Sequence, residues 1–152
     1  MTASFATPTS GLPDPDYEAE FYADVPAKRL MAWVIDVLLI SLLVGLATML
    51  GFFLPLLFLP FLFFCVSFLY RWTTIASGSA TPGMRIMAIE LRNIHGRKLD
   101  GGQAFLHTAG YAFSVLTVPL QLVSIVMMLS TARGQGLTDT VLGTTAINRR
   151  AR

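Results

Sequence analysis

The sequence predicts an all-α integral membrane protein with two transmembrane helices, a third apolar helix, and a small β-hairpin between the second and third. Hydrophobic residues make up 54% of the 152-residue chain and charged residues only 13%, whereas soluble domains contain roughly 45–50% apolar and 25% charged residues. Three apolar blocks, residues 30–50, 51–70 and 104–130, contain one acidic residue and no lysine or arginine. These observations favour a lipid-embedded protein over a water-soluble one.

Residues 1–26 form an acidic segment that is predicted to be disordered. The segment carries five Asp or Glu side chains and no lysine or arginine. Such a composition cannot bury enough apolar surface to offset the entropy of ordering. A secretory signal is not expected, because the positive charge and early apolar run of a signal are missing. We expect one transmembrane domain over residues 27–149, followed by a basic tail at residues 150–152.

The first two apolar blocks predict a helical hairpin, with helices at about residues 30–50 and 54–72. The first block has 21 residues, which at about 1.5 Å per residue matches the roughly 30 Å hydrocarbon thickness of a bilayer. A single helix through both blocks would be twice too long. We therefore expect the chain to turn near Gly51 and Pro55. Trp72 is typical of the point where a helix leaves the membrane.

The loop between residues 71 and 103 is predicted to lie in water, because it carries five basic residues. Within it, residues 87–92 alternate between apolar side chains and others in the period-two pattern of a strand with one wet face. His95 and Gly96 supply a turn before residues 97–99. The loop therefore predicts a short β-hairpin.

The third block, residues 104–130, is longer than one perpendicular crossing needs and is interrupted by Pro119. Two arrangements remain open: a tilted, kinked helix that crosses the membrane, or a re-entrant segment that returns to its starting side. Basic loops resist translocation, so the N-terminus and the loop 71–103 are expected in the cytoplasm. A re-entrant segment would place all eleven basic residues on that side, whereas a crossing would leave the last four outside.

Asp36 lies about 10 Å along the first helix from Arg29, inside the hydrocarbon zone. Inserting a carboxylate there costs about 2.5–3.5 kcal/mol, so we expect a polar partner on another segment. The expected partners are a basic residue of the loop or one of His107, Thr108, Ser114 and Gln121. Asp36 is a candidate proton or cation site, assisted by His107 and Arg29. The alternative is a structural contact that fixes helix register.

Thr81, Pro82, Gly83 and Arg85 form a motif that favours a turn at the start of a short helix or strand. The alternative is a binding site for a lipid phosphate at Arg85.

Other functional classes are not expected. The net charge of +2 is too small for a nucleic-acid binder. Cys65 is the single cysteine and the two histidines are 12 residues apart, so neither a metal site nor a cofactor is predicted. We also expect no enzyme, because no set of nucleophile, base and oxyanion donor can be assembled.

Three sequence elements resemble the RDD family of bacterial membrane proteins. They are Arg29-Leu30-Met31-Ala32 with Ile35-Asp36, Thr81-Pro82-Gly83-Met84-Arg85-Ile86, and Leu137-Thr138-Asp139 with Gly143-Thr144. The family takes its name from an arginine and two aspartates, which match Arg29, Asp36 and Asp139. Met84 stands where the family commonly has lysine, and His107 where it commonly has arginine. The resemblance implies a bacterial inner-membrane protein of mostly undetermined role, for which transport is often suggested.

The family match makes Asp139 a candidate partner of Arg29 or Arg85 at the membrane surface. That pairing requires both groups on one side of the membrane, which favours the re-entrant third segment. The alternative is an acid in the N-cap or first turn of a short surface helix.

Two functional hypotheses follow. In the first, Asp36 serves in ion or small-solute transport. Three helices enclose too little volume for a pathway, so this hypothesis predicts a homo-oligomer packed through the small residues Ala32, Gly45 and Ala47. In the second, the protein is a non-transporting membrane scaffold or accessory subunit, and its charged residues only fix the helix arrangement. Both hypotheses make the lipid bilayer a partner and leave the protein partner open.

Overall fold

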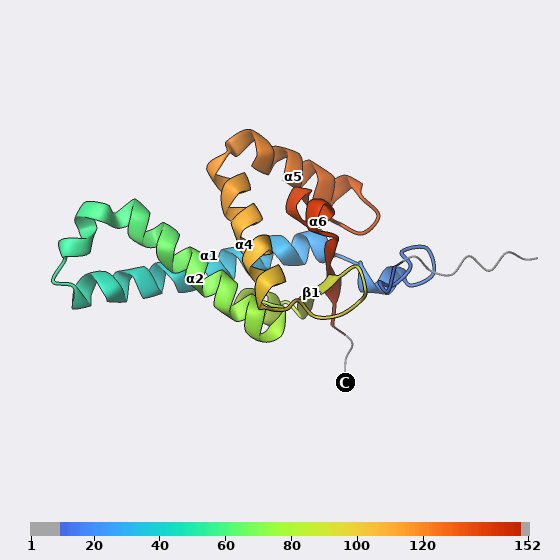
Figure 1. Cartoon of the computed structure of the whole chain (residues 1–152), viewed down its shortest axis with the longest axis horizontal. Helices are drawn as coiled ribbons and strands as arrows, with labels where there is room; N and C mark the ends of the chain where they lie inside the picture. Colours follow the sequence, from blue (N-terminus) through green and yellow to red (C-terminus); the bar gives the residue numbers. More distant parts are fainter. Residues whose placement is uncertain (1–9, 150–152) are drawn as a thin grey trace, which may run out of the picture.

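The computed structural model describes residues 10–149. In chain order its elements are η1 (Ala19–Phe21), α1 (Val25–Leu50), η2 (Leu54–Phe58), α2 (Leu59–Gly78), α3 (Pro82–Ile86), β1 (Ile89–Asn93), α4 (Gly101–Leu116), α5 (Val118–Ser130), α6 (Leu137–Leu142) and β2 (Thr144–Asn148). Figure 1 shows a long arm formed by α1 and α2, and a second helix pair, α4 and α5, beside its base. The short helices α3 and α6 and the two strands gather at that base (Figure 1).

The α1/α2 arm confirms the two long apolar helices. Both are long and apolar enough to cross a membrane. The turn between them lies where the sequence predicts it, and Phe52 and Phe53 adopt positive φ angles of 51° and 62° there. The second regular helix begins later than expected, because residues 54–58 form the 3₁₀ helix η2, with Pro55 in its first turn. It also continues beyond residue 72, to Gly78.

The third apolar block is two helices rather than one. The chain bends by 116° between α4 and α5, at Thr117. Pro119 lies in the first turn of α5, where its missing N–H is tolerated, whereas a continuous helix would lose a hydrogen bond at this position. α4 begins with a capping box, in which Asp100 accepts a hydrogen bond from the Gln103 amide at 2.8 Å. The bend therefore turns α5 back toward the base of the arm (Figure 1).

The sheet corrects the predicted hairpin. β1 pairs antiparallel with β2, in a register that runs from Ile89 opposite Asn148 to Asn93 opposite Thr144. Residues 97–99, the expected second strand, belong to no strand. The Asn93 side chain accepts hydrogen bonds from the backbone of His95 and Arg97 and closes a tight turn. The chain then leaves the sheet, where the Leu99 amide donates to the Ser79 hydroxyl at 2.8 Å.

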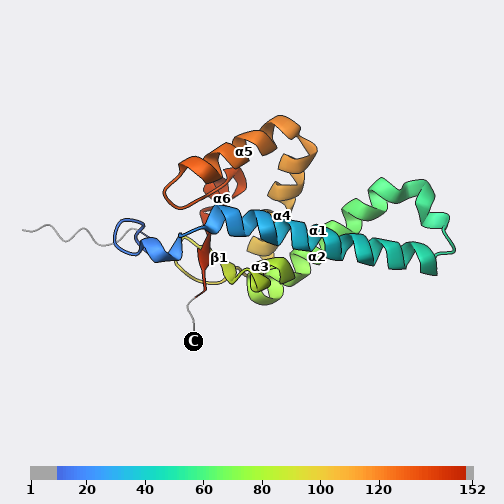
Figure 2. The same cartoon turned by 180° about the vertical axis from the view of Figure 1, so that it is seen from behind.

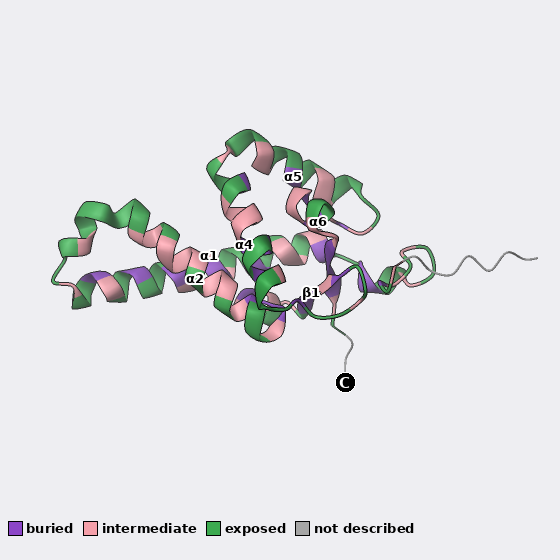
Figure 3. Cartoon of the chain, in the orientation of Figure 1, coloured by how far each residue is buried: buried purple, intermediate pink, exposed green. Residues whose placement is uncertain are grey.

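The core lies where the start of α1 and the end of α2 meet the sheet. Its buried residues come from the start of α1, the end of α2, β1, the loop after it, the start of α4, and β2: Val25, Ala32, Ile75, Ile89, Leu91, Leu99, Ala104 and Ala146. Figure 3 shows buried residues concentrated in this region, whereas the outer faces of the arm and of α4 and α5 are exposed. Those outer faces are rich in leucine, phenylalanine and valine. The arrangement is typical of a protein whose water-exposed end is folded like a small domain and whose helices face lipid.

The pairing of β1 with β2 brings the segments before and after the third block together. The loop strand and the strand after α6 lie side by side at the base of the arm, opposite the turn at residues 51–54 (Figure 2). The chain thus returns after α5 to the end from which α4 started. This is the geometry of the re-entrant alternative.

The predicted disorder of residues 1–26 is wrong for the part that the structure describes. Leu12, Phe21 and Tyr22 are buried, and the last two pack with Ile147 of β2. The Gly11 amide donates to the Ile94 carbonyl at 2.8 Å. The acidic composition misled the prediction, because two aromatic side chains find an apolar surface that only the C-terminal strand provides. Residues 1–9 of this tail, and the basic tail at 150–152, lie outside the described residues.

Candidate functional site

Asp36 is buried at the contact between α1, α2 and α3, with 1% of its surface exposed. Its Oδ1 accepts hydrogen bonds from the Tyr70 hydroxyl at 2.8 Å and from the Gly83 amide at 2.9 Å. Its Oδ2 accepts one from the Thr81 hydroxyl at 2.6 Å. Arg71 Nη1 lies 3.9 Å from Oδ2, which is too far for a hydrogen bond but close enough for charge attraction. Three donors and one nearby cation therefore stabilise the carboxylate.

The Thr81-Pro82-Gly83 motif explains how α3 presents these donors. Thr81 is the N-cap of α3, and its hydroxyl both accepts from the Met84 amide at 3.2 Å and donates to Asp36. Pro82 occupies the first turn, where a missing amide costs little. The first helical amides have no partner within a helix, and here the Gly83 amide finds one in Asp36. The expected turn is thus a capped short helix, docked by its N-terminus on α1.

Gly83 is required by close approach. A β-carbon built on Gly83 would clash with the carbonyl oxygen of Ala32 and would lie 2.8 Å from Asp36 Oδ1. Ala32 is itself buried within this contact. Ala32 is therefore not available for packing against a second copy, which corrects that part of the predicted oligomer contact. Gly45 is exposed on α1, with nothing within 4 Å of a β-carbon built there.

Asp139 forms a second buried acidic centre in the first turn of α6. Its Oδ2 lies 2.5 Å from Arg29 Nη1 and accepts the Gly136 amide at 3.1 Å. Its Oδ1 lies 2.9 Å from His107 Nε2 and accepts the Thr144 hydroxyl at 3.1 Å. This centre joins α1, α4, α6 and β2.

The charges around Asp139 outweigh its burial. Burial alone would raise the pKa of this carboxyl, but the Arg29 charge and the His107 hydrogen bond hold its pKa below the usual 3.8. Gly143 ends α6 with a φ of +64°, a left-handed conformation that suits glycine, and directs the chain so that Thr144 reaches the acid. The family element that ends in Gly143-Thr144 is thus part of the same centre.

The structure separates residues that the sequence grouped. Arg29 and His107 contact Asp139 and not Asp36, so the predicted assistance of Asp36 by His107 and Arg29 is wrong. The predicted pairing of Asp139 with Arg29 is confirmed. The third-block partners expected for Asp36 also lie elsewhere: Ser114, for example, bonds Gln121. A helix of 3.6 residues per turn gives Arg29 and Asp36 similar directions, but it does not say which elements pack beside each of them.

The sequence missed one partner of Asp36, the Tyr70 hydroxyl. The other expectation, a basic residue of the loop 71–103, is met by Arg71, which lies in α2 and approaches Asp36 across the hairpin. The predicted hairpin could have indicated these contacts. Two antiparallel helices joined near residue 52 place residues that are about equally far from the turn side by side.

Arg85 lies apart from both acids. Its guanidinium donates to the carbonyl oxygens of Ala80 at 3.3 Å and Thr74 at 3.4 Å, and to the Ser77 hydroxyl at 3.4 Å. These contacts hold the end of α2 against α3. The Arg85 donors thus already bond groups of the same chain. The predicted lipid-phosphate site at Arg85 stays a prediction.

The two acidic centres offer no metal site of the usual kind. Within residues 10–149 no group of three His, Cys, Asp and Glu side chains is placed to hold a metal ion. Each carboxylate is surrounded by hydrogen-bond donors, whereas a cation needs acceptor oxygens. The arrangement is suited to holding helices together around a negative charge.

Comparison with family models gives a match to the RDD family over residues 24–143. The chain belongs to the RDD family. The matched residues include Arg29, Asp36 and Asp139, and they cover both acidic centres and the whole helical arm. No curated protein and no solved structure matches the chain. Together with the two long apolar helices, family membership indicates a membrane protein.

A Gly83→Ala variant should be destabilised by roughly 2 kcal/mol, because the new methyl group must push α3 away from α1 and lengthen the hydrogen bonds to Asp36. The measurement is the free energy of unfolding in detergent micelles. Gly45→Ala is the matched control, since its methyl group meets open space and alanine favours a helix. Equal stability of the Gly83→Ala variant and wild type would refute the close-approach role of Gly83.

An Asp139→Asn variant should lose roughly 3 kcal/mol of stability at pH 7, because Arg29 is left without its partner. Since the folded pKa of Asp139 is below 3.8, its contribution is present above that pH and is lost as the pH falls through and below it. The difference between wild type and variant should therefore shrink below about pH 4. Unfolding curves between pH 7 and pH 3 measure this, with the exposed Asp16→Asn as the control. A difference independent of pH would contradict the assignment.

Proposed function

We propose that the protein is a non-transporting membrane scaffold or accessory subunit, in which the family's charged residues hold the helices together. The observation that carries this proposal is the bonding of Asp36. All three of its donors belong to elements that must pack on α1 for the fold to form. A carboxylate that carries a proton or cation has to release its partners during each cycle. Releasing these would detach α3 from α1.

Asp139 supports the same proposal. Its four partners come from the start of α1, from α4, from the turn before α6 and from the start of β2. The acid thereby ties the C-terminal part of the chain to the helical arm. The proposal includes no enzymatic step, because the acids and their basic partners in residues 10–149 are engaged with one another.

Transport by way of Asp36 is the second candidate, and one observation favours it. Arg71 lies 3.9 Å from Asp36 and also lines a cavity between α1, α2 and α4, so the acid is one side chain away from an open space. A homo-oligomer would be needed to complete a pathway, and Gly45 and Ala47 remain as its packing residues.

Reconstitution in liposomes distinguishes these two functions. With a pH gradient or an alkali-cation gradient imposed, wild-type vesicles should show the same flux as protein-free vesicles, because no carrier residue is free. The same flux is measured for Asp36→Asn and for Asp100→Asn. Asp100→Asn is the control, because it removes an acid elsewhere in the chain and asparagine is also a good N-cap for α4. A wild-type flux that disappears in Asp36→Asn and persists in Asp100→Asn would overturn the scaffold and establish transport.

The orientation we propose is a bacterial inner-membrane protein with the base of the arm in the cytoplasm. Basic residues such as Lys28, Arg97, Lys98 and Arg149 belong to segments at that end, and basic segments stay on the cytoplasmic side. The strand pairing then brings the C-terminal segment to the same side as the loop.

Cysteine labelling checks this orientation. In a Cys65→Ser background, single cysteines at the exposed positions Phe53, Lys98 and Ala132 are treated with a membrane-impermeant maleimide in vesicles of both orientations. Lys98→Cys and Ala132→Cys should react from the cytoplasmic face, and Phe53→Cys from the other. Labelling of Ala132→Cys on the side of Phe53→Cys would show that the third block crosses the membrane.

A further inference from the structure

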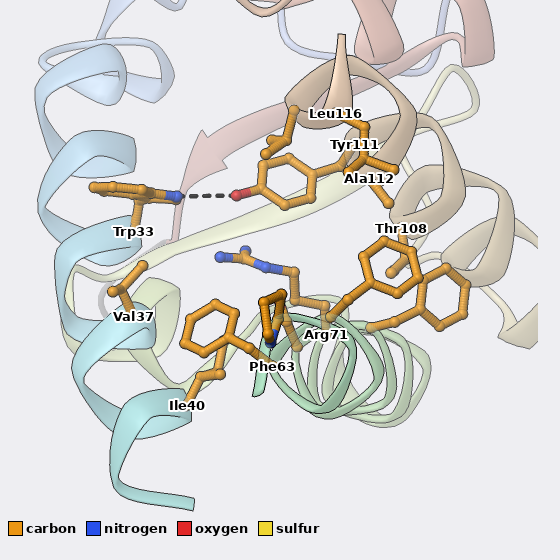
Figure 4. A pocket seen from close by; sticks show the side chains of 14 residues that line it. Trp33, Val37, Ile40, Phe63, Arg71, Thr108, Tyr111, Ala112 and Leu116 are labelled. Atoms are coloured by element: carbon orange, nitrogen blue, oxygen red, sulfur yellow. Dashed lines mark hydrogen bonds between the residues drawn. The ribbon is translucent and has the colours of Figure 1, made fainter. Parts of the chain in front are cut away.

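A cavity of about 270 Å³ lies between α1, α2 and α4. Along α2 it extends from Arg71 to Pro60, two positions that are eleven residues apart and about 16 Å apart along the helix. Most of its lining is apolar, and includes Val37, Ile40 and Phe63 (Figure 4). Its volume lies just below the roughly 300–1,000 Å³ of typical small-molecule sites. The space is therefore long, narrow and apolar over most of its length.

One end of this cavity is polar and carries donors without partners. Within residues 10–149 the buried Arg71 Nε and the buried Thr108 hydroxyl make no hydrogen bond, and both residues line the cavity. Thr108 is 1% exposed. Figure 4 shows the Arg71 guanidinium pointing into the space between Trp33 and Tyr111 on one side and Val37 on the other. Buried donors are costly to leave unpaired, so this end is suited to an acceptor from outside the chain.

Among the residues that the structure describes, the Arg71 guanidinium is held in place without using its donors. Its carbon lies 4.4 Å from the centre of the Tyr111 ring, and that tyrosine's hydroxyl accepts a hydrogen bond from the Trp33 indole at 2.9 Å. The nearest carboxylate oxygen, on Asp36, is 3.9 Å away and already accepts from Thr81. Arg71 thus supplies a positive charge and planar N–H groups, the combination that binds phosphate oxygens.

The surroundings indicate a ligand that comes from the bilayer. Trp33 on α1 and Tyr111 on α4 line the polar end, and tryptophan and tyrosine mark the head-group level of a membrane. Phe64, which lies closer to Pro60 along α2, lines the cavity and is also exposed, so the apolar part reaches the outer surface of the helices. A soluble anion would leave this apolar part empty.

We propose that the cavity binds an anionic phospholipid of the membrane. The phosphate accepts hydrogen bonds from Arg71 and Thr108, and one acyl chain lies along α2 toward Pro60. The site uses neither buried carboxylate, although it shares Arg71 with the Asp36 centre. The proposal goes beyond a scaffold function by assigning a ligand class to it.

Fluorescence quenching tests the proposal. In a Trp72→Phe background, Trp33 is the reporter, because it lines the cavity. The protein is reconstituted in phosphatidylcholine vesicles that contain brominated phosphatidylglycerol or, at the same mole fraction, brominated phosphatidylcholine. We expect wild type to prefer the anionic lipid at least fivefold. Arg71→Gln should reduce the preference at least threefold and Thr108→Val at least twofold.

Arg85→Gln is the matched control, because it removes the same charge from a guanidinium outside the cavity that bonds its own chain. It should keep the preference. Ala112→Phe places an aromatic ring in the cavity one helical turn from Thr108 and leaves both Arg71 and Thr108 unsubstituted, and it should also reduce the preference if an acyl chain lies there. Thr108→Val and Ala112→Phe keep the Arg71 charge beside Asp36, so they test the site even if Arg71→Gln fails to fold.

Three results would overturn the proposal. Equal quenching by the two brominated lipids in wild type, or equal losses in Arg71→Gln and Arg85→Gln, would show only general attraction of anionic lipid to a basic surface. Displacement of the anionic lipid by millimolar inorganic phosphate would assign the polar end to a soluble phosphate instead.

Discussion

The fold depends on one buried carboxylate. Asp36 stands in an otherwise apolar stretch of α1, and the chain satisfies it with a hydroxyl from α2 and with a hydroxyl and an amide from α3. The cost of the buried charge is offset only when all three elements are assembled. The carboxylate therefore specifies how the hairpin closes and where α3 docks, which apolar packing between leucine-rich helices does not do by itself.

Asp139 extends the same physical rule to the rest of the chain. The acid lies in a six-residue helix that has little stability of its own, and its partners on α1, α4 and β2 hold that helix in place. The two centres use different residues of α1. Arg29 near its start supplies a cation to one centre, and Asp36, seven residues further along, supplies the anion of the other. The spacing of Arg29 and Asp36 therefore reflects two separate contacts made by one helix.

The sequence predicted the parts of this structure that follow from local physics. The length and hydropathy of the apolar blocks predicted the helical hairpin and its turn, and the depth of Asp36 predicted that it needs polar partners. The identity of those partners was out of reach, because Tyr70 and the Gly83 amide come from segments 34 and 47 residues away. The partner of β1 was predicted wrongly for the same reason. The local turn at His95-Gly96 suggested residues 97–99 as the second strand, whereas the actual partner, β2, lies near the C-terminus.

The sequence by itself determined that this chain has two apolar helices long enough for a membrane, an intramembrane acid that requires partners, and the three motifs of its family. These properties are set by hydrophobicity, helix rise and residue type, all of which act within a short stretch of chain. Only the tertiary structure decided that His107 and Arg29 serve Asp139, that the third block bends back, and that Arg71 points into a cavity with its donors unpaired. Each of these depends on which helix packs beside which, and many packings of apolar helices are nearly equal in energy until buried polar groups select one.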